Sequence, residues 1–188
     1  MLKKHIESLV RAQTSLNRNI EKGIILDRNE RVDVFDKTTF KKIIKSISKY
    51  SLSATPDITS LYEQIAKYHG LKRNNIYITQ GITECISHIM FSILNKRDEA
   101  IILHPTYPMY EVISKLHNAR YKFWKFNKEF KLDINDLKKL ITKKTKILFL
   151  VNPNLPIEHE FSEAQKNEIY KICKKRNILV VYDEAYYH

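Results

Sequence analysis

Glycine is scarce in this sequence. Only Gly23, Gly70 and Gly81 occur among 188 residues, and no two of them lie within ten positions of each other. A Walker phosphate-binding loop and a dinucleotide-binding fingerprint each need clustered glycines. The sequence therefore excludes nucleotide binding through either of these two motifs.

Long apolar runs and paired cysteines are missing as well. No run approaches the roughly 20 apolar residues that a membrane helix needs, and the N-terminal segment carries Glu7 and lacks the apolar core of a signal peptide. The two cysteines, Cys85 and Cys173, fall on helical patterns and show neither disulfide nor metal-ligand spacing. We expect no membrane partner, no metal site and a cytoplasmic location.

Acidic residues are outnumbered, with 21 Asp and Glu against 33 Lys and Arg, which gives a net charge of +12. Such an excess can indicate a nucleic-acid partner. It can also reflect a solvated surface, because the lysines are spread over most of the predicted helices and loops. The solvated surface is the favoured interpretation, and nucleic acid is not the expected partner. A non-catalytic basic interaction module, binding nucleic acid, remains the alternative function.

The first 70 residues predict helices and an extended arm. Apolar residues at near-helical spacing predict a helix within residues 1–20, and residues 23–26 predict an extended arm that leads into a polar turn. Another helix is predicted around 40–47. Pro56 interrupts the helical pattern, and Asp57 is the predicted cap of a helix that stops at Gly70.

After Gly70, strand and helix patterns alternate, which predicts an α/β fold with a mostly parallel sheet covered by helices. A capping-box signal, Ser162 with Gln165, marks the start of the last helix. We divide the chain into an N-terminal helical arm, 1–50, and a larger domain, 51–188. The predicted strands are 76–79, 100–104, 120–126, 146–151 and 178–182, and the predicted helices are 82–95, 108–117, 133–142 and 162–175.

Two loops that follow predicted strands carry groups suited to a ligand. At Gly81 a strand turns into a helix, whose free N–H groups and dipole favour a phosphate, although glycine is also ordinary in such turns. Tyr107 lies between Pro105 and Pro108. A rigid tyrosine at a strand end can stack on a planar ligand, or it can simply pack against the protein.

A third group combines the 152–156 turn with Asp183, at the carboxyl end of the last strand. Asparagines in such turns commonly bind their own backbone. Asp183 and Tyr186 are suited to a ligand cation and hydroxyl, or Asp183 caps a following helix. Ligands bind at the carboxyl ends of strands in open α/β sheets, so these loops are the candidate site.

As an ordered set, these motifs resemble the fold-type-I, pyridoxal-phosphate-dependent aminotransferases of class I/II, and in particular their histidinol-phosphate aminotransferase branch. The motifs are the Gly81 turn, Tyr107, the Asn-Pro turn at 152–156 and the Asp-Glu-Ala-Tyr run that begins at Asp183. The resemblance extends from about Leu26 to the end of the sequence. It covers the N-terminal arm and roughly the first half of the family's large domain.

The resemblance implies a role for each of these residues. The backbone amides of Ile82 and Thr83, with the Thr83 hydroxyl, would hold the phosphate of pyridoxal 5′-phosphate. Tyr107 would stack on the pyridine ring, Asp183 would pair with the protonated ring nitrogen, and Tyr186 would bind the phenolic oxygen of the ring. The implied partners are a small-molecule amino donor, a 2-oxo acid acceptor and a second copy of the chain in a homodimer.

The sequence departs from the family pattern at two motifs. Leu155 stands where the family has the asparagine that contacts the ring oxygen, and Asn154 is the substitute for that cofactor contact. The family's Tyr-Pro-Asp, whose tyrosine reaches the partner subunit's cofactor, reads Thr55-Pro56-Asp57 here. These departures weaken the expected ring-oxygen and cross-subunit contacts.

No catalytic residue is assigned, because the family's Schiff-base lysine lies in a Ser-x-x-Lys motif well beyond the strand-end aspartate. Ser46 and Lys49 match that spacing but precede the sheet, so we interpret the match as chance. We expect a chain that is inactive alone, either a truncated gene product or a part of a longer protein. A pseudoenzyme that pairs with an intact paralogue is a further possibility. The family's sheet also places strand 76–79 beside later strands, so we expect the other four strands to form one block.

Overall fold

The computed structural model describes residues 4–7, 9, 24, 31 and 33–186. The chain divides into two compact units. One contains helix α1 (Lys4–Glu7), residue 9 and residues 79–186, and the other contains the described residues 24, 31 and 33–78. The two domains expected from the sequence, 1–50 and 51–188, stay a prediction. The extended arm and polar turn expected at 23–30 lie almost entirely outside the described residues.

The larger unit is built on one parallel sheet of four strands in the order β2-β1-β3-β4. All three strand pairs are parallel. The fold class and four of the predicted strands are therefore confirmed, with ends that shift by one residue. The strands are β1 (Glu99–His104), β2 (Arg120–Lys125), β3 (Thr145–Val151) and β4 (Leu179–Asp183).

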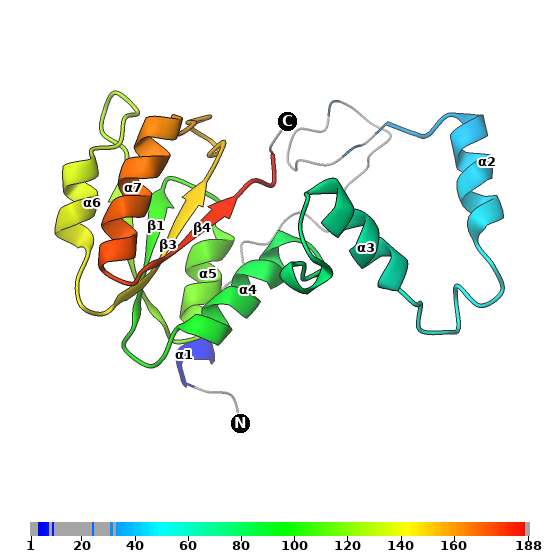
Figure 1. Ribbon diagram of the computed structural model, residues 1–188, viewed down its shortest axis with the longest axis horizontal. Helices are drawn as coiled ribbons and strands as arrows, with labels where there is room; N and C mark the ends of the chain where they lie inside the picture. Colours follow the sequence, from blue (N-terminus) through cyan, green and yellow to red (C-terminus); the bar gives the residue numbers. More distant parts are fainter. Residues whose placement is uncertain (1–3, 8, 10–23, 25–30, 32, 187–188) are drawn as a thin grey trace. The chain divides into compact units, whose positions relative to one another are not determined.

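Helices cover both faces of this sheet, as the alternating pattern predicts. Figure 1 shows α6 and α7 on one face and α4 and α5 on the other. The predicted capping box is present, since the Ser162 side chain binds the backbone N–H of Gln165 and the Gln165 side chain binds that of Ser162. The helices are α4 (Ile82–Ile93), α5 (Met109–Leu116), α6 (Ile134–Leu140) and α7 (Glu163–Lys175).

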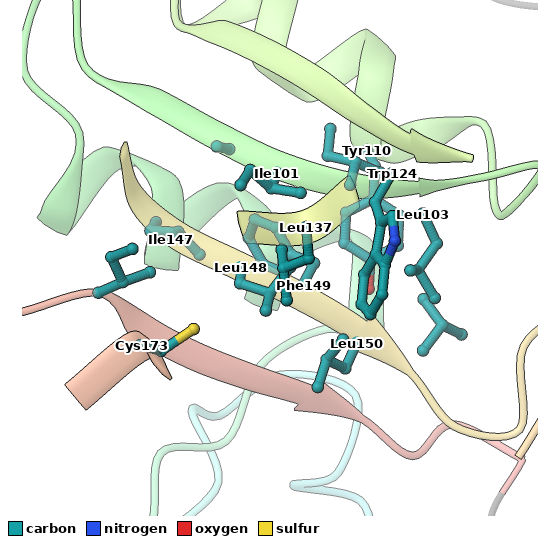
Figure 2. Packing of buried hydrophobic residues seen from close by; sticks show 14 of the residues in the cluster. Ile101, Leu103, Tyr110, Trp124, Leu137, Ile147, Leu148, Phe149, Leu150 and Cys173 are labelled. Carbon is teal, nitrogen blue, oxygen red and sulfur yellow. The ribbon is translucent and has the colours of Figure 1, made fainter. Parts of the chain in front are cut away.

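The core lies between the sheet and these helices (Figure 2). Strand β3 is buried on both faces, and Leu148, Phe149 and Leu150 have no exposed surface. This is the continuous apolar run expected of a central parallel strand. On one face Phe149 packs against Tyr110 of α5, with ring centroids 4.9 Å apart. The core therefore fixes α5 against the middle of the sheet.

The prediction of a strand at 76–79 is wrong. In the described part of the chain this stretch pairs with no strand, although Ile76 has an extended backbone. The Ile78 N–H donates instead to the Tyr62 hydroxyl, at 3.2 Å. The sequence pattern reports β propensity, but a strand forms only where a neighbouring strand supplies ladder hydrogen bonds.

The smaller unit contains α2 (Lys37–Ser46), α3 (Thr59–Tyr68) and the 3-10 turn Arg73–Asn75. The helix stop predicted at Gly70 is confirmed, because Gly70 adopts φ +63° just beyond α3. The predicted cap needs a correction of one residue, since Ile58 is the N-cap of α3. Asp57 still accepts the Thr59 N–H at 2.9 Å, because an Asp side chain reaches two residues along its own backbone.

No helix within the described ranges is both long and apolar enough to span a membrane. The same residues contain no group of three or more His, Cys, Asp or Glu side chains arranged to hold a metal ion. Cys85 and Cys173 are both free thiols.

Candidate functional site

The carboxyl ends of β1, β3 and β4 meet at one edge of the sheet. Strands β3 and β4 are in register up to the pair Val151 and Asp183, and the Asn152 N–H donates to the Asp183 carbonyl at 2.9 Å. Strand β1 ends at His104, directly before the loop that carries Tyr107. In a parallel sheet this is the edge at which ligands bind. The topology thus brings the 152–156 turn, Tyr107 and Asp183 to one edge.

Helix α4 begins at Gly81, which adopts φ +85° as the N-cap residue. The first N–H groups of a helix have no acceptor within the helix, and here they belong to Ile82 and Thr83. A Cβ added at Gly81 would meet no atom within 4 Å, so the space beside the turn is open. The Gln80 N–H is already used, since it donates to the Glu84 carboxylate at 2.5 Å.

The Thr83 hydroxyl lies 3.0 Å from the Tyr107 hydroxyl, within hydrogen-bonding distance. This bond joins the start of α4 to the loop after β1, across 24 positions of sequence. Tyr107 is 40% exposed, so much of its ring surface is accessible to a ligand. The structure therefore brings the predicted phosphate contact and the predicted stacking ring together.

Asp183 is 5% exposed and lies at the end of β4. Its Oδ2 accepts the Tyr110 hydroxyl at 2.5 Å, and its Oδ1 accepts the Ala185 N–H at 3.1 Å. Burial, followed by the negative charge of Asp183, raises the pKa of the Tyr110 phenol and that of the Cys85 thiol. Tyr110 also packs edge-on against Tyr107, with ring centroids 6.4 Å apart. Asp183 is thus linked through Tyr110 to the Thr83–Tyr107 pair.

Asn154 is fully buried and connects two loops. Its Oδ1 accepts the Thr106 hydroxyl at 2.6 Å, and its Nδ2 donates to the Pro105 carbonyl at 3.0 Å. Asn152 fixes the same turn, because its Oδ1 accepts the Phe161 N–H at 2.8 Å. Asn154 therefore holds the loop that carries Tyr107, and its contact with a cofactor stays a prediction.

Tyr186 is 48% exposed and follows Asp183 by three residues. The structure places it at the same end of β4 as Asp183, and its role toward the ring oxygen also stays a prediction. Lys49, from the Ser-x-x-Lys match, belongs to the smaller unit, and its ammonium lies 5.2 Å from the centroid of the Tyr50 ring.

A cavity of about 140 Å³ lies beside the Tyr107 loop. Tyr107 and Tyr110 are among its lining residues and Thr83 and Asp183 are not, so this cavity adjoins the predicted site on the side of the Tyr107 loop. The lining residues are Ile102, His104, Pro105, Thr106, Tyr107, Pro108, Tyr110, Glu111 and Phe123.

Sequence reasoning missed Tyr110 and Thr106. Tyr110 follows Tyr107 by three positions in the same proline-containing stretch, and this proximity in the sequence was the available signal for Tyr110. No local sequence pattern indicated a role for Thr106, because its partner, Asn154, is 48 residues away in the sequence.

Comparison with known proteins agrees with the sequence resemblance. The family model "Aminotransferase class I and II" matches residues 23–188. The histidinol-phosphate aminotransferase of Thermoanaerobacter sp. (strain X514) is 33% identical over 190 residues, which cover 97% of this chain and 53% of that protein. The chain spans about half the length of the curated relatives that it matches.

Solved structures show the same fold. An alanine aminotransferase from Pyrococcus furiosus is similar with a TM-score of 0.66 and 25% identity, over 80% of this chain and 40% of the other. Cystalysin from Treponema denticola, whose structure contains pyridoxal 5′-phosphate, is similar in fold with a TM-score of 0.67 at 18% identity, over 77% of this chain and 38% of that one. The matched residues include the Gly81 turn, the Tyr107 loop and Asp183, and the chain belongs to the aminotransferase class I and II family.

Proposed function

We propose that this chain binds pyridoxal 5′-phosphate and forms part of an aminotransferase. The observation that carries the proposal is the linked set at the carboxyl edge of the sheet. Thr83 binds Tyr107, Tyr107 packs on Tyr110, and Tyr110 binds Asp183. An anion-binding helix start, an accessible aromatic ring and a buried carboxylate are thereby held together by segments from three parts of the sequence.

The residues present fit this cofactor. Its phosphate needs N–H and O–H donors, which the first turn of α4 and the Thr83 hydroxyl supply. Its ring needs a flat apolar surface, which Tyr107 supplies at 40% exposure. Its ring nitrogen, when protonated, needs an anion, and Asp183 has lone pairs beyond those that Tyr110 and Ala185 use.

Each residue would act on binding and orientation. The amides of Ile82 and Thr83 would anchor the phosphate, and Tyr107 would fix the plane of the ring. Asp183 would hold a proton on the ring nitrogen, because a buried carboxylate favours a neighbouring cation. When bound, pyridoxal phosphate supplies an electron sink for the negative charge that develops at the α-carbon of the substrate.

The proposed reaction moves an amino group between an amino acid or amine and a 2-oxo acid. The relatives' name, histidinol-phosphate aminotransferase, makes a phosphorylated amino alcohol a candidate amino donor for the whole protein. A homodimer is the proposed assembly. These statements concern a whole enzyme, of which this chain spans about half the length of its matched relatives.

The Asp183→Asn variant tests the proposal. Asparagine keeps the size and an acceptor for Tyr110 but removes the charge that would pair with the ring nitrogen, so we expect about 100-fold weaker cofactor binding. Pyridoxamine 5′-phosphate is the suitable probe, because it has no aldehyde to react with the many lysines. Isothermal titration of the 1–188 chain gives the dissociation constant.

Asp136→Asn is the matched control. Asp136 forms an exposed ion pair with Lys139, at 2.9 Å on α6, and its loss should leave cofactor affinity unchanged. Failure of the unsubstituted chain to bind the probe would contradict the proposed function. Equal affinity of the Asp183→Asn variant and the unsubstituted chain would exclude Asp183 as the ring partner.

A further inference from the structure

We infer that Tyr110 is a positioning residue for Asp183, which holds the carboxylate in one orientation and keeps its negative charge available to the pyridine ring. This inference rests on the proposed function, since it assigns a role toward the same cofactor. The sequence motifs assign no role to Tyr110, and its role follows from where the fold places its hydroxyl.

The geometry around Tyr110 leaves its side chain little freedom. The residue is 1% exposed, and its ring packs on Phe149 of β3, with centroids 4.9 Å apart (Figure 2). The Ser114 hydroxyl donates to the Tyr110 carbonyl at 2.7 Å, one helical turn further on. The phenol is therefore fixed by α5 and by the central strand, and it reaches Asp183 at 2.5 Å.

The direction of the bond is also fixed. Burial, together with the charge of Asp183, raises the pKa of the Tyr110 phenol, so the phenol stays protonated and donates. The Cys85 thiol on α4 is a second titratable group near Asp183, and burial with the same charge raises its pKa too. Both neighbours are thus uncharged near neutral pH.

A neutral donor has a different effect on a carboxylate than a cation has. A hydrogen bond from a phenol stabilises the charged carboxylate over its protonated form, but it adds no positive charge that would offset the carboxylate's field. The bond from Tyr110 would therefore orient the Asp183 carboxylate toward the ring nitrogen of a bound cofactor without offsetting its charge.

Tyr110→Phe tests this role, because it removes the hydroxyl and keeps the ring. Because the variant loses a hydrogen bond to a charged group, we expect its affinity for pyridoxamine 5′-phosphate to fall about tenfold. The ring-nitrogen resonance of 15N-labelled cofactor should shift toward the unprotonated pyridine.

A double-mutant cycle separates positioning from packing. If Tyr110 acts through Asp183, then Tyr110→Phe should cause no further loss of affinity in the Asp183→Asn background. A full tenfold loss in that background would overturn the inference. Tyr121→Phe is the matched control, since it removes a phenol hydroxyl from β2, and it should change neither the affinity nor the 15N shift.

The outcomes also separate the two proposals. No cofactor binding by the unsubstituted chain would refute the proposed function. Binding by the unsubstituted chain, with an unchanged affinity and 15N shift in Tyr110→Phe, would refute the inference alone. If the Phe variant unfolds, p-aminophenylalanine at position 110 keeps the ring and a neutral donor. It should retain the 15N shift of the unsubstituted chain, and loss of that shift would contradict the role.

Discussion

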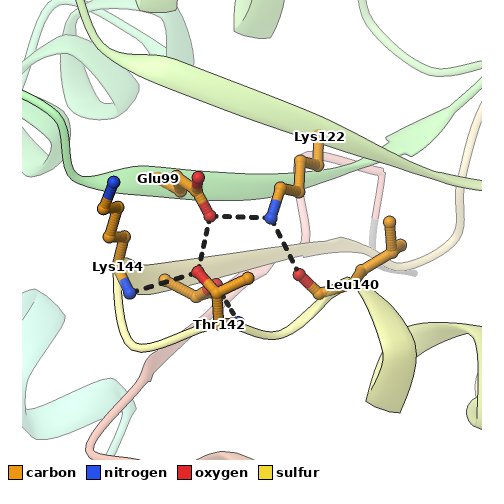
Figure 3. Close-up of polar contacts among 6 residues, drawn as sticks. Glu99, Lys122, Leu140, Thr142 and Lys144 are labelled. Carbon is orange, nitrogen blue, oxygen red and sulfur yellow. Dashed lines mark hydrogen bonds and ion pairs between the residues drawn. The ribbon is translucent and has the colours of Figure 1, made fainter.

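A buried carboxylate lies at each end of the sheet, and the two carboxylates differ in the partners that bind them. At the amino end, Glu99 of β1 is 7% exposed, and its Oε2 lies 2.8 Å from the Lys122 ammonium and accepts the Thr142 hydroxyl at 2.8 Å. Lys122 also donates to the Leu140 carbonyl at 3.2 Å (Figure 3). At the carboxyl end, Asp183 has the Tyr110 phenol and the Ala185 N–H as its hydrogen-bond partners.

The difference lies in the countercharge. The Lys122 ammonium of the neighbouring strand β2 neutralises Glu99. The bonds of Glu99 therefore connect β1, β2 and the loop before β3, and its charge is not available to a ligand. Among the described residues, the hydrogen bonds that Asp183 accepts come from neutral donors, and the proposed function assigns its charge to the ring nitrogen of the cofactor. The ion pair at the amino end stabilises the sheet, whereas the carboxylate at the other end is the group that we propose pairs with the cofactor.

We expect the largest effect from Leu148→Ala, which should lower the stability of the whole sheet and therefore affect its two ends equally. Leu148 is fully buried in β3, in register with Ile101 of β1 and Val180 of β4. Truncation of such a leucine costs about 4 kcal/mol of the free energy of unfolding. Urea denaturation followed by circular dichroism measures this loss.

The control for that variant is Leu179→Ala. Leu179 is 43% exposed, so its truncation should cost less than about 1 kcal/mol. If Leu148→Ala were as mild as the control, the core described for this unit would be wrong.

Glu99→Gln should weaken the amino end alone. It removes the charge opposite Lys122, so the free energy of unfolding should fall by about 2 kcal/mol, because Lys122 keeps part of its solvation. The affinity for pyridoxamine 5′-phosphate should stay within about twofold of the unsubstituted chain when both are folded. A large loss of affinity with intact folding would contradict the separation of the two ends.

The pH dependence of stability gives the sign of the Glu99 contribution. Burial disfavours the charge of Glu99, but the Lys122 ammonium and the Thr142 hydroxyl outweigh it and lower the pKa of this carboxyl group. The stabilisation is therefore fully present above the ordinary Glu pKa of about 4.3 and is lost as pH falls through the lower, folded value. Acid titration of the unsubstituted chain should show this loss, and Glu99→Gln should show less of it.

The smallest expected effects come from the same substitution at the two ends. Thr83→Val removes the hydroxyl next to Tyr107 and should weaken cofactor binding by about threefold to tenfold, with little change in stability. Thr142→Val removes a donor to Glu99 and should lower the free energy of unfolding by about 1 kcal/mol, with cofactor affinity unchanged. Titration and urea denaturation of both variants complete the comparison, and equal effects on affinity would remove the distinction between the ends.

The sequence predicted the regular part of the larger unit well. Continuous apolar runs located β1 and β3, because a strand buried on both faces must be apolar throughout. The capping box at Ser162 located the start of α7, because that motif is local. The sequence failed at 76–79, where an apolar extended segment lacks a partner strand in the described chain.

The sequence by itself determined the local features: the strands and helices, the glycine turn at Gly81, and the order of motifs that marks the family. The tertiary structure alone decided which buried polar side chains form hydrogen bonds with each other. Tyr110 and Asp183 are 73 residues apart, as Thr106 and Asn154 are 48 apart, and no local pattern links them. The reason is physical. Propensity and capping act over a few residues, whereas the neighbour of a buried polar group depends on which strands and helices the core packs together.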